Sequence, residues 1–277
     1  MSYVDLMLNI ASLLIWLNWR AVVFIRPASA LSIASAIKPA NKLSGSRHWR
    51  LLGALVALVC LRAVFYWQFG PSLDWTPQLK LGVLVISFQC ESFLRMLLFS
   101  GLSFLLTAAV FYFCLLFLAA VNHKEPETDE WQKNIRLHLG LLTFLPAVVQ
   151  LILPFVLTAL VWPACYWVFF QLHMMPVSAG FWPLVQQSLV VGLGSLLAWK
   201  YFLVGLLLLH LLNAYIYFGG ASFWYFIAVT GRNTLWWLRW LRLGKLDLAP
   251  LIGMALLVAG GELLSRWLPV LYQKLPL

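Results

Sequence analysis

The chain has 277 residues, of which 63% are hydrophobic and only 10% are charged, and its mean hydropathy is +0.89. This composition excludes a water-soluble globular domain and predicts an all-α, polytopic integral membrane protein, because a bilayer accepts apolar surface that no soluble core could hide. The formal net charge is +10. Its basic residues lie in loops beside apolar segments, which favours anionic lipid headgroups and excludes nucleic acid as a partner.

The first 70 residues predict two spans, at about 4–25 and 51–69, joined by a basic loop. Asp5 precedes the first apolar run and no basic segment leads into it, so we do not expect a cleavable signal peptide. The loop 26–50 carries no acid, and we expect it to face the cytoplasm. Its basic residues are Arg26, Lys38, Lys42, Arg47 and Arg50.

The middle region begins with an outer connection over 70–80, followed by an apolar stretch over 81–122 that is too long for one perpendicular span. We expect a surface or tilted helix near 81–97 and a span near 98–121; one long tilted helix is the alternative. Glu91 and Arg95 are four residues apart and would be neighbours on such a helix. The hydrophilic segment 123–138 is placed in the cytoplasm.

A fourth span is expected within 139–170, where three prolines should kink or divide the helix: Pro146, Pro154 and Pro163. After an outer loop at 171–183, the apolar stretch 184–218 is either one steeply tilted helix or a surface segment followed by a span at 199–218. His210 and Asn213 would share one side of that span, where a hydrogen bond between helices is expected of His210. The last span is expected at about 248–268.

A basic, tryptophan-rich stretch precedes the last span. Arg232, Arg239, Arg242 and Lys245 alternate there with Trp and Leu, which predicts an amphipathic helix over 232–243 in the plane of the membrane, capped by Asn233 or Thr234. The arginines and the lysine are expected to contact lipid headgroups or a partner. A tight turn should follow.

Asp247 and Pro250 stand where the start of a helix favours an acid and a proline. The run Gly244-Lys245-Leu246-Asp247-Leu248-Ala249-Pro250 resembles the Gly-x-x-Asp-x-Ser-Pro element of the bacterial YggT family, which has chloroplast relatives. Ala249 replaces the usual Ser, and the match covers roughly the last 70 residues. Gly244, Asp247 and Pro250 are the motif residues.

The resemblance implies two repeats, each made of a span, a basic loop and a returning span. The segment 13–18 aligns with 208–213, so the expected organisation is a first repeat at 1–70, a middle region at 71–183 and a second repeat at 184–277. Six spans with both termini outside, in the bacterial inner membrane, complete this prediction. The family is associated in general terms with membrane-complex organisation, envelope homeostasis and osmotic tolerance.

The sequence offers no phosphate loop, HExxH or GxSxG motif, and its four cysteines lack metal-ligand spacing, so no cofactor, metal or catalytic residue is predicted. A polar group inside a membrane needs a partner. For Arg62 the candidates are Glu262, Glu91, a backbone carbonyl or another subunit, whereas Glu262 and Arg266 can pair locally. The intramembrane polar residues are Asn18, Arg62, Lys200, His210, Asn213 and Glu262.

The sequence is therefore interpreted as a non-catalytic structural, assembly or organising subunit that binds other integral membrane subunits. A transporter or channel subunit is the alternative, because repeats around a polar site are typical of transporters. A lipid-modifying enzyme ranks third, since only the segment 123–136 offers enough polar groups at headgroup level.

Overall fold

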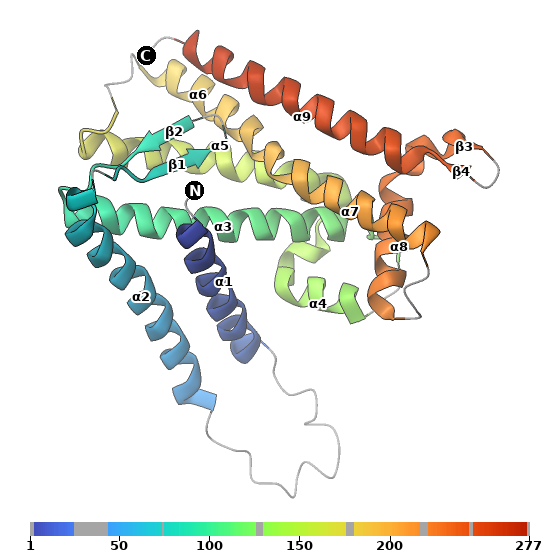
Figure 1. Ribbon diagram of the computed structural model, residues 1–277, viewed down its shortest axis with the longest axis horizontal. Helices are drawn as coiled ribbons and strands as arrows, with labels where there is room; N and C mark the ends of the chain where they lie inside the picture. The colour runs from blue at the N-terminus through green and yellow to red at the C-terminus, as the bar shows by residue number, and fades with distance from the viewer. Residues whose placement is uncertain are drawn as a thin grey trace, which may run out of the picture. The chain divides into compact units, whose positions relative to one another are not determined.

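A computed structural model describes residues 3–24, 44–73, 75–82, 84–125, 130–175, 180–216, 221–243 and 246–275. Over these ranges the chain is helical, apart from two short hairpins (Figure 1). The α-helices are α1 (Tyr3–Phe24), α2 (Ser44–Phe69), α3 (Phe93–Val121), α4 (Glu130–Leu139), α5 (Ala147–Gln171), α6 (Phe181–Gly194), α7 (Ala198–Tyr215), α8 (Ser222–Thr234) and α9 (Ala249–Gln273). The fold is all-α, as predicted.

The shorter elements connect these helices. They comprise the 3-10 helices η3 (Pro71–Leu73), η4 (Gly140–Phe144), η5 (Ser195–Leu197) and η6 (Trp236–Leu241), and the strands β1 (Gln78–Leu81), β2 (Leu84–Ser87), β3 (Arg242–Leu243) and β4 (Leu246–Asp247). β1 pairs with β2, and β3 pairs with β4 in antiparallel register.

Five helical segments of the described chain are long and apolar enough to cross a membrane: 49–69, 93–121, 147–171, 181–215 and 249–273. Only 11% to 39% of the most apolar stretch of each is fully buried, and many large apolar side chains of the segments 49–69, 147–171, 181–215 and 249–273 are exposed. A chain whose long apolar helices expose such faces is a multi-pass membrane protein. α1 has the length of a span but also carries Asp5, Asn9 and Arg20, so six spans remain a prediction.

The chain forms two compact units. The first comprises residues 1–79 and 86–109, and the second comprises 80–85 and 110–277, so that α3 contributes to both. In the first unit α1 packs against α2. In the second, α5 packs against α6, and α7 packs against both α8 and α9 (Figure 1).

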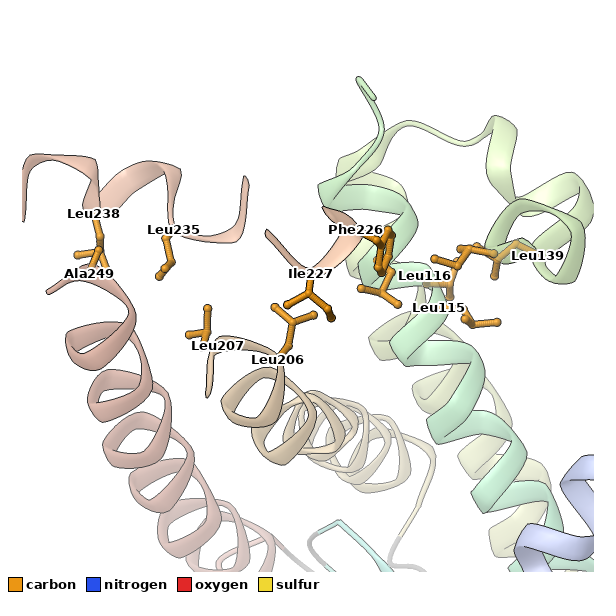
Figure 2. Packing of buried hydrophobic residues seen from close by; sticks show 12 residues of the cluster. Leu115, Leu116, Leu139, Leu206, Leu207, Phe226, Ile227, Leu235, Leu238 and Ala249 are labelled. Atoms are coloured by element: carbon orange, nitrogen blue, oxygen red, sulfur yellow. The ribbon is translucent and has the colours of Figure 1, made fainter. Parts of the chain in front are cut away.

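The core of the second unit lies where several helices end. Leucine, isoleucine and phenylalanine side chains from α3, α4, α7 and α8 meet there with the start of α9 (Figure 2). The twelve buried members are Leu115, Leu116, Leu118, Ile135, Leu139, Leu206, Leu207, Phe226, Ile227, Leu235, Leu238 and Ala249. This cluster holds α8 and η6 against the ends of the membrane-capable helices.

The middle region differs from the prediction in two places. The expected surface helix near 81–97 is wrong, because 78–87 forms the β1–β2 hairpin and a single helix, α3, runs from Phe93 to Val121. Gly82 has a φ of +59° at the turn, a conformation that favours glycine. Within the predicted fourth span, the division falls before Ala147, and α5 continues through Pro154 and Pro163 without interruption.

The C-terminal region differs as well. The stretch 184–218 is not one regular helix, because η5 interrupts it between α6 and α7. α7 at 198–215 agrees with the alternative of a span at 199–218, and the surface position of the segment before it stays a prediction. The prediction of one continuous amphipathic helix over 232–243 is wrong: α8 ends at Thr234, and the residues that follow form the 3-10 helix η6 and the strand β3. The position of this stretch in the membrane plane stays a prediction. β3 and β4 pair antiparallel, and residues 244–245 between them, where the predicted turn falls, lie outside the described residues.

The crossing of α7 and α8 depends on a glycine. His210 of α7 is buried, and a Cβ at Gly231 of α8 would overlap the His210 imidazole ring. Close to this contact, Asn213 Nδ2 of α7 donates a hydrogen bond to the Trp224 carbonyl of α8 at 3.1 Å. The two helices therefore approach as closely as a residue without a side chain allows.

We predict that Gly231→Ala destabilises the protein by about 1–3 kcal/mol, because the added methyl group overpacks the His210 contact. The matched control is Gly205→Ala on α7, where nothing lies within 4 Å of an added Cβ. In a helix that change should be neutral or stabilise by up to about 1 kcal/mol. Unfolding by SDS in mixed micelles measures both variants. Introducing His210→Ala should relieve the cost of Gly231→Ala; an undiminished cost would show that this contact is not its cause.

Candidate functional site

The first candidate site is a buried ionic cluster in the first unit, centred on Arg62 of α2. One guanidinium nitrogen, Nη2, donates to Asp5 Oδ1 at 2.6 Å, and the other, Nη1, donates to Asn9 Oδ1 at 2.7 Å. Nη2 also lies 3.2 Å from the Ser103 hydroxyl of α3. Three helices thus meet at one arginine.

The acid of this pair has a second partner, since the Tyr66 hydroxyl also donates to Asp5 Oδ1. Asp5 and Arg62 are almost fully buried, at 3% and 4% exposure. The Arg62 guanidinium carbon lies 5.2 Å from the centre of the Phe99 ring, close enough for a cation–π contact. The cluster is electrically neutral, and its geometry suits a structural role.

Local sequence explains how α1 supplies its part. Asp5, Asn9 and Ser12 follow one another at intervals of four and three residues, so they share one face of the helix. All three are buried, whereas Tyr3, Met7 and Leu14 on other faces are exposed. α1 therefore carries its polar stripe inward and its apolar surface outward, as suits a helix in lipid.

Arg62 pairs with the buried Asp5, which was not among the candidates that the sequence suggested, so Glu262 is not its counter-charge. Sequence reasoning missed Asp5, Asn9, Tyr66 and Ser103 as partners. A signal was present: α1 and α2 are consecutive helices in contact, which can bring the start of α1 beside the later part of α2. Asn18, another predicted intramembrane polar residue, is exposed on α1.

The second candidate site is an ionic cluster between α7 and α9. Lys200 Nζ donates to Glu262 Oε2 at 3.2 Å, and Arg266 Nε donates to Glu262 Oε1 at 3.3 Å. The local pair of Glu262 with Arg266 is confirmed, and Lys200 joins it. Gly261 makes the approach possible, because a Cβ there would lie 2.6 Å from Cδ of Lys200. The Glu262 and Arg266 side chains are exposed by 51% and 77%.

A third network, made mostly of neutral side chains, holds α3, α4 and α8 together. Asn122 Nδ2 donates to the Thr230 hydroxyl at 2.8 Å, and Gln132 Nε2 donates to the Asn122 carbonyl at 2.6 Å. Asn233 Nδ2 lies 3.2 Å from Asn122 Oδ1 and 3.3 Å from Glu125 Oε1. Asn233 therefore joins helices at the end of α8, and the prediction that it caps a helix starting there is wrong.

The aromatic part of the basic stretch lies on the surface. Trp236, Trp237 and Trp240 are exposed, whereas Leu235 and Leu238 are 5% and 3% exposed and belong to the core cluster. The segment is thus held by its leucines with its tryptophans outward. Arg232 and Arg239 are also exposed; Gly244 and Lys245 lie outside the described residues.

The motif residues start α9. The Ala249 amide donates to Asp247 Oδ1 at 3.1 Å, which confirms that Asp247 satisfies a free amide at the start of the last span. Pro250 occupies the first turn of α9, where its missing N–H costs nothing, and it is buried. The described residues contain no group of three or more His, Cys, Asp or Glu side chains that could hold a metal ion.

Cys90, outside the helices, lies in a tight contact with the loop after α2. Its thiol donates to the Trp75 carbonyl, with Sγ at 3.0 Å, and burial raises the pKa of the thiol. A thiol of raised pKa is a poor nucleophile at neutral pH. This contact is therefore structural.

Comparison with known proteins places the chain in no family: no family model, curated protein or solved structure matches it.

We predict that Asp5→Asn destabilises the protein by about 3–5 kcal/mol, because it leaves Arg62 buried without its counter-charge. Replacing both partners, Asp5→Leu with Arg62→Met, should recover much of this loss. Arg232→Gln is the control, since Arg232 is exposed and its change should stay within about 0.5 kcal/mol. The measurement is again unfolding in mixed micelles. If the Asp5→Asn and Arg232→Gln variants are equally stable, the Asp5–Arg62 ion pair does not stabilise the fold as predicted.

We also predict that Asp247→Asn is tolerated, whereas Asp247→Ala lowers stability by about 1 kcal/mol, because an amide oxygen can still accept the bond from the start of α9. Unfolding midpoints and membrane abundance of the two variants, measured side by side, test this. If Asn fails as badly as Ala, the negative charge of Asp247 matters in addition to its hydrogen bond.

Proposed function

We propose that this chain is a non-catalytic subunit that organises or stabilises a membrane-protein complex in a bacterial inner membrane, with both termini outside. The observation that carries the proposal is the use made of its buried polar groups. Arg62, Asp5, Asn9 and Ser103 join three helices of one unit, and Asn122 and Thr230 join helices of the other. Groups fixed in this way serve packing and leave little for chemistry.

The exposed surface of the helices also supports the proposal of a complex subunit. Apart from α3, the membrane-capable helices expose large apolar side chains along much of their length. Lipid covers such faces, and so do the helices of other membrane subunits. Trp236, Trp237 and Trp240, with Arg232 and Arg239 nearby, suit the boundary between acyl chains and anionic headgroups, which we propose as the lipid contact.

The resemblance of the last 70 residues to the YggT family agrees with this proposal. Asp247 and Pro250 perform the structural task that the motif suggests, namely starting the last helix. We propose membership of that family, with the second repeat at 184–277.

The alternative is a transporter or channel subunit, and one feature favours it. η5 breaks the segment 181–215 just before Lys200, and broken helices beside a charged group are typical of ion and substrate sites. Lys200 is engaged by Glu262, however, and that bond makes a structural site the simpler explanation.

We predict that the protein, extracted from native membranes in mild detergent, migrates with other integral membrane proteins in a fixed ratio. Blue-native electrophoresis followed by quantitative mass spectrometry measures this. An unrelated membrane protein carrying the same tag, expressed at matched abundance, is the control. Migration of the chain alone in every detergent, together with solute flux in proteoliposomes that is lost on Lys200→Gln, would favour the transporter instead.

A further inference from the structure

The Lys200–Glu262–Arg266 cluster lies deep along α9. Glu262 is 13 residues from the start of the helix, which at 1.5 Å per residue is about 20 Å. Lys200 is 15 residues before the end of α7 at Tyr215, or about 22 Å. A hydrocarbon core is about 30 Å thick, so a helix that starts at one interface carries position 262 inside it.

The cluster is also unshielded on one side. Glu262 and Arg266 are exposed by 51% and 77%, and their neighbours Leu263 and Trp267 by 60% and 59%. α9 packs against α6 and α7, and Lys200 of α7 reaches Glu262, while Leu263, Arg266 and Trp267 stay open. An exposed ionic group facing acyl chains is costly, so this face requires a cover that can accept hydrogen bonds.

The charges of the cluster indicate which chemical group should cover this face. Two cations, Lys200 and Arg266, share one carboxylate, Glu262, which leaves a net charge of +1. Among the other described acids of this unit, Asp247 stands before the start of α9, Glu125 bonds to Asn233 and Glu130 starts α4, so none of the three supplies the missing charge. A second copy of the same face would bring another +1 and repel the first. The group that would neutralise this excess charge is a carboxylate carried by an otherwise apolar helix.

We propose that the exposed face of α9 around Glu262 and Arg266 binds a transmembrane helix of a different subunit that presents an Asp or Glu side chain to Arg266. This inference rests on the proposed function and names the docking site for it. Gly260 favours such packing, because nothing lies within 4 Å of a Cβ added there and a partner helix can approach the backbone.

The test places a photo-crosslinking amino acid, p-benzoylphenylalanine, at Leu263 in the full chain in native membranes. The control is the same probe at Leu160 of α5, in the same unit, whose side chain is 70% exposed. The expected result is a discrete protein adduct at position 263 and none at 160. Its cross-linked peptide should lie in an apolar span that holds an Asp or Glu, and changing that acid to its amide should lower the yield about tenfold.

A second measurement avoids any effect of the probe on folding. Arg266→Gln changes an exposed side chain, so the unfolding midpoint should stay unchanged while incorporation into the native complex falls about tenfold. Arg266→Glu should act likewise and be rescued when the partner's acid is changed to Arg. The proposal would be overturned by equal labelling at both positions or by no labelling. It would also be overturned if the adducts were only with lipid, with a second copy, or with residues 3–79 of the same chain. If the complex persists unchanged with Arg266→Gln, this docking site is wrong while the proposed function stands; if no complex exists, the proposed function fails.

Discussion

A charge inside a low-dielectric environment must be neutralised where it stands, and much of this structure follows from that constraint. Arg62 is the clearest case. The ordinary way to stabilise a helix hairpin, burying apolar residues between the helices, gives little in a bilayer, because lipid covers apolar residues equally well. Polar contacts retain their value there. The hydrogen bonds of Arg62 with Asp5, Asn9 and Ser103 therefore fix the arrangement of α1, α2 and the first part of α3. Apolar contacts alone would not specify this arrangement.

The second unit solves the same problem with different groups. Asn122, Gln132 and Thr230 are neutral, so they join α3, α4 and α8 without a desolvated charge. Close to them the apolar cluster holds η6 against the start of α9. The neutral amides lie at helix ends, where the membrane interface tolerates them. The ion pair lies farther along α7 and α9, where Lys200 needs Glu262 as its partner.

Composition alone was sufficient to predict an all-α membrane protein, and hydropathy placed most of the apolar helices within a few residues. What it could not predict were the places where local pattern and tertiary contact compete. The segment 78–87 contains alternating Leu79 and Leu81 with a glycine at position 82, a hairpin signal hidden inside a long apolar run. The basic stretch after α8 has a helical distribution of arginines, yet Leu235 and Leu238 are three residues apart and fit a 3-10 turn over the core. The role of Asp5 was missed because its partner is 57 positions away, and only the pairing of the consecutive helices α1 and α2 pointed to it.

The contrast between the two ionic sites says most about function. Both sites join helices through an arginine or lysine and a carboxylate, but Asp5 and Arg62 are almost fully enclosed, whereas Glu262 and Arg266 remain open on one side. A buried neutral ion pair requires no partner outside the chain, so its contribution is to the stability of the fold. An open cluster with an excess positive charge is satisfied only by something outside that unit. The same chemistry thus joins helices within one unit and leaves an unmatched positive charge on α9, which is why we propose the last span as the place where a partner subunit binds.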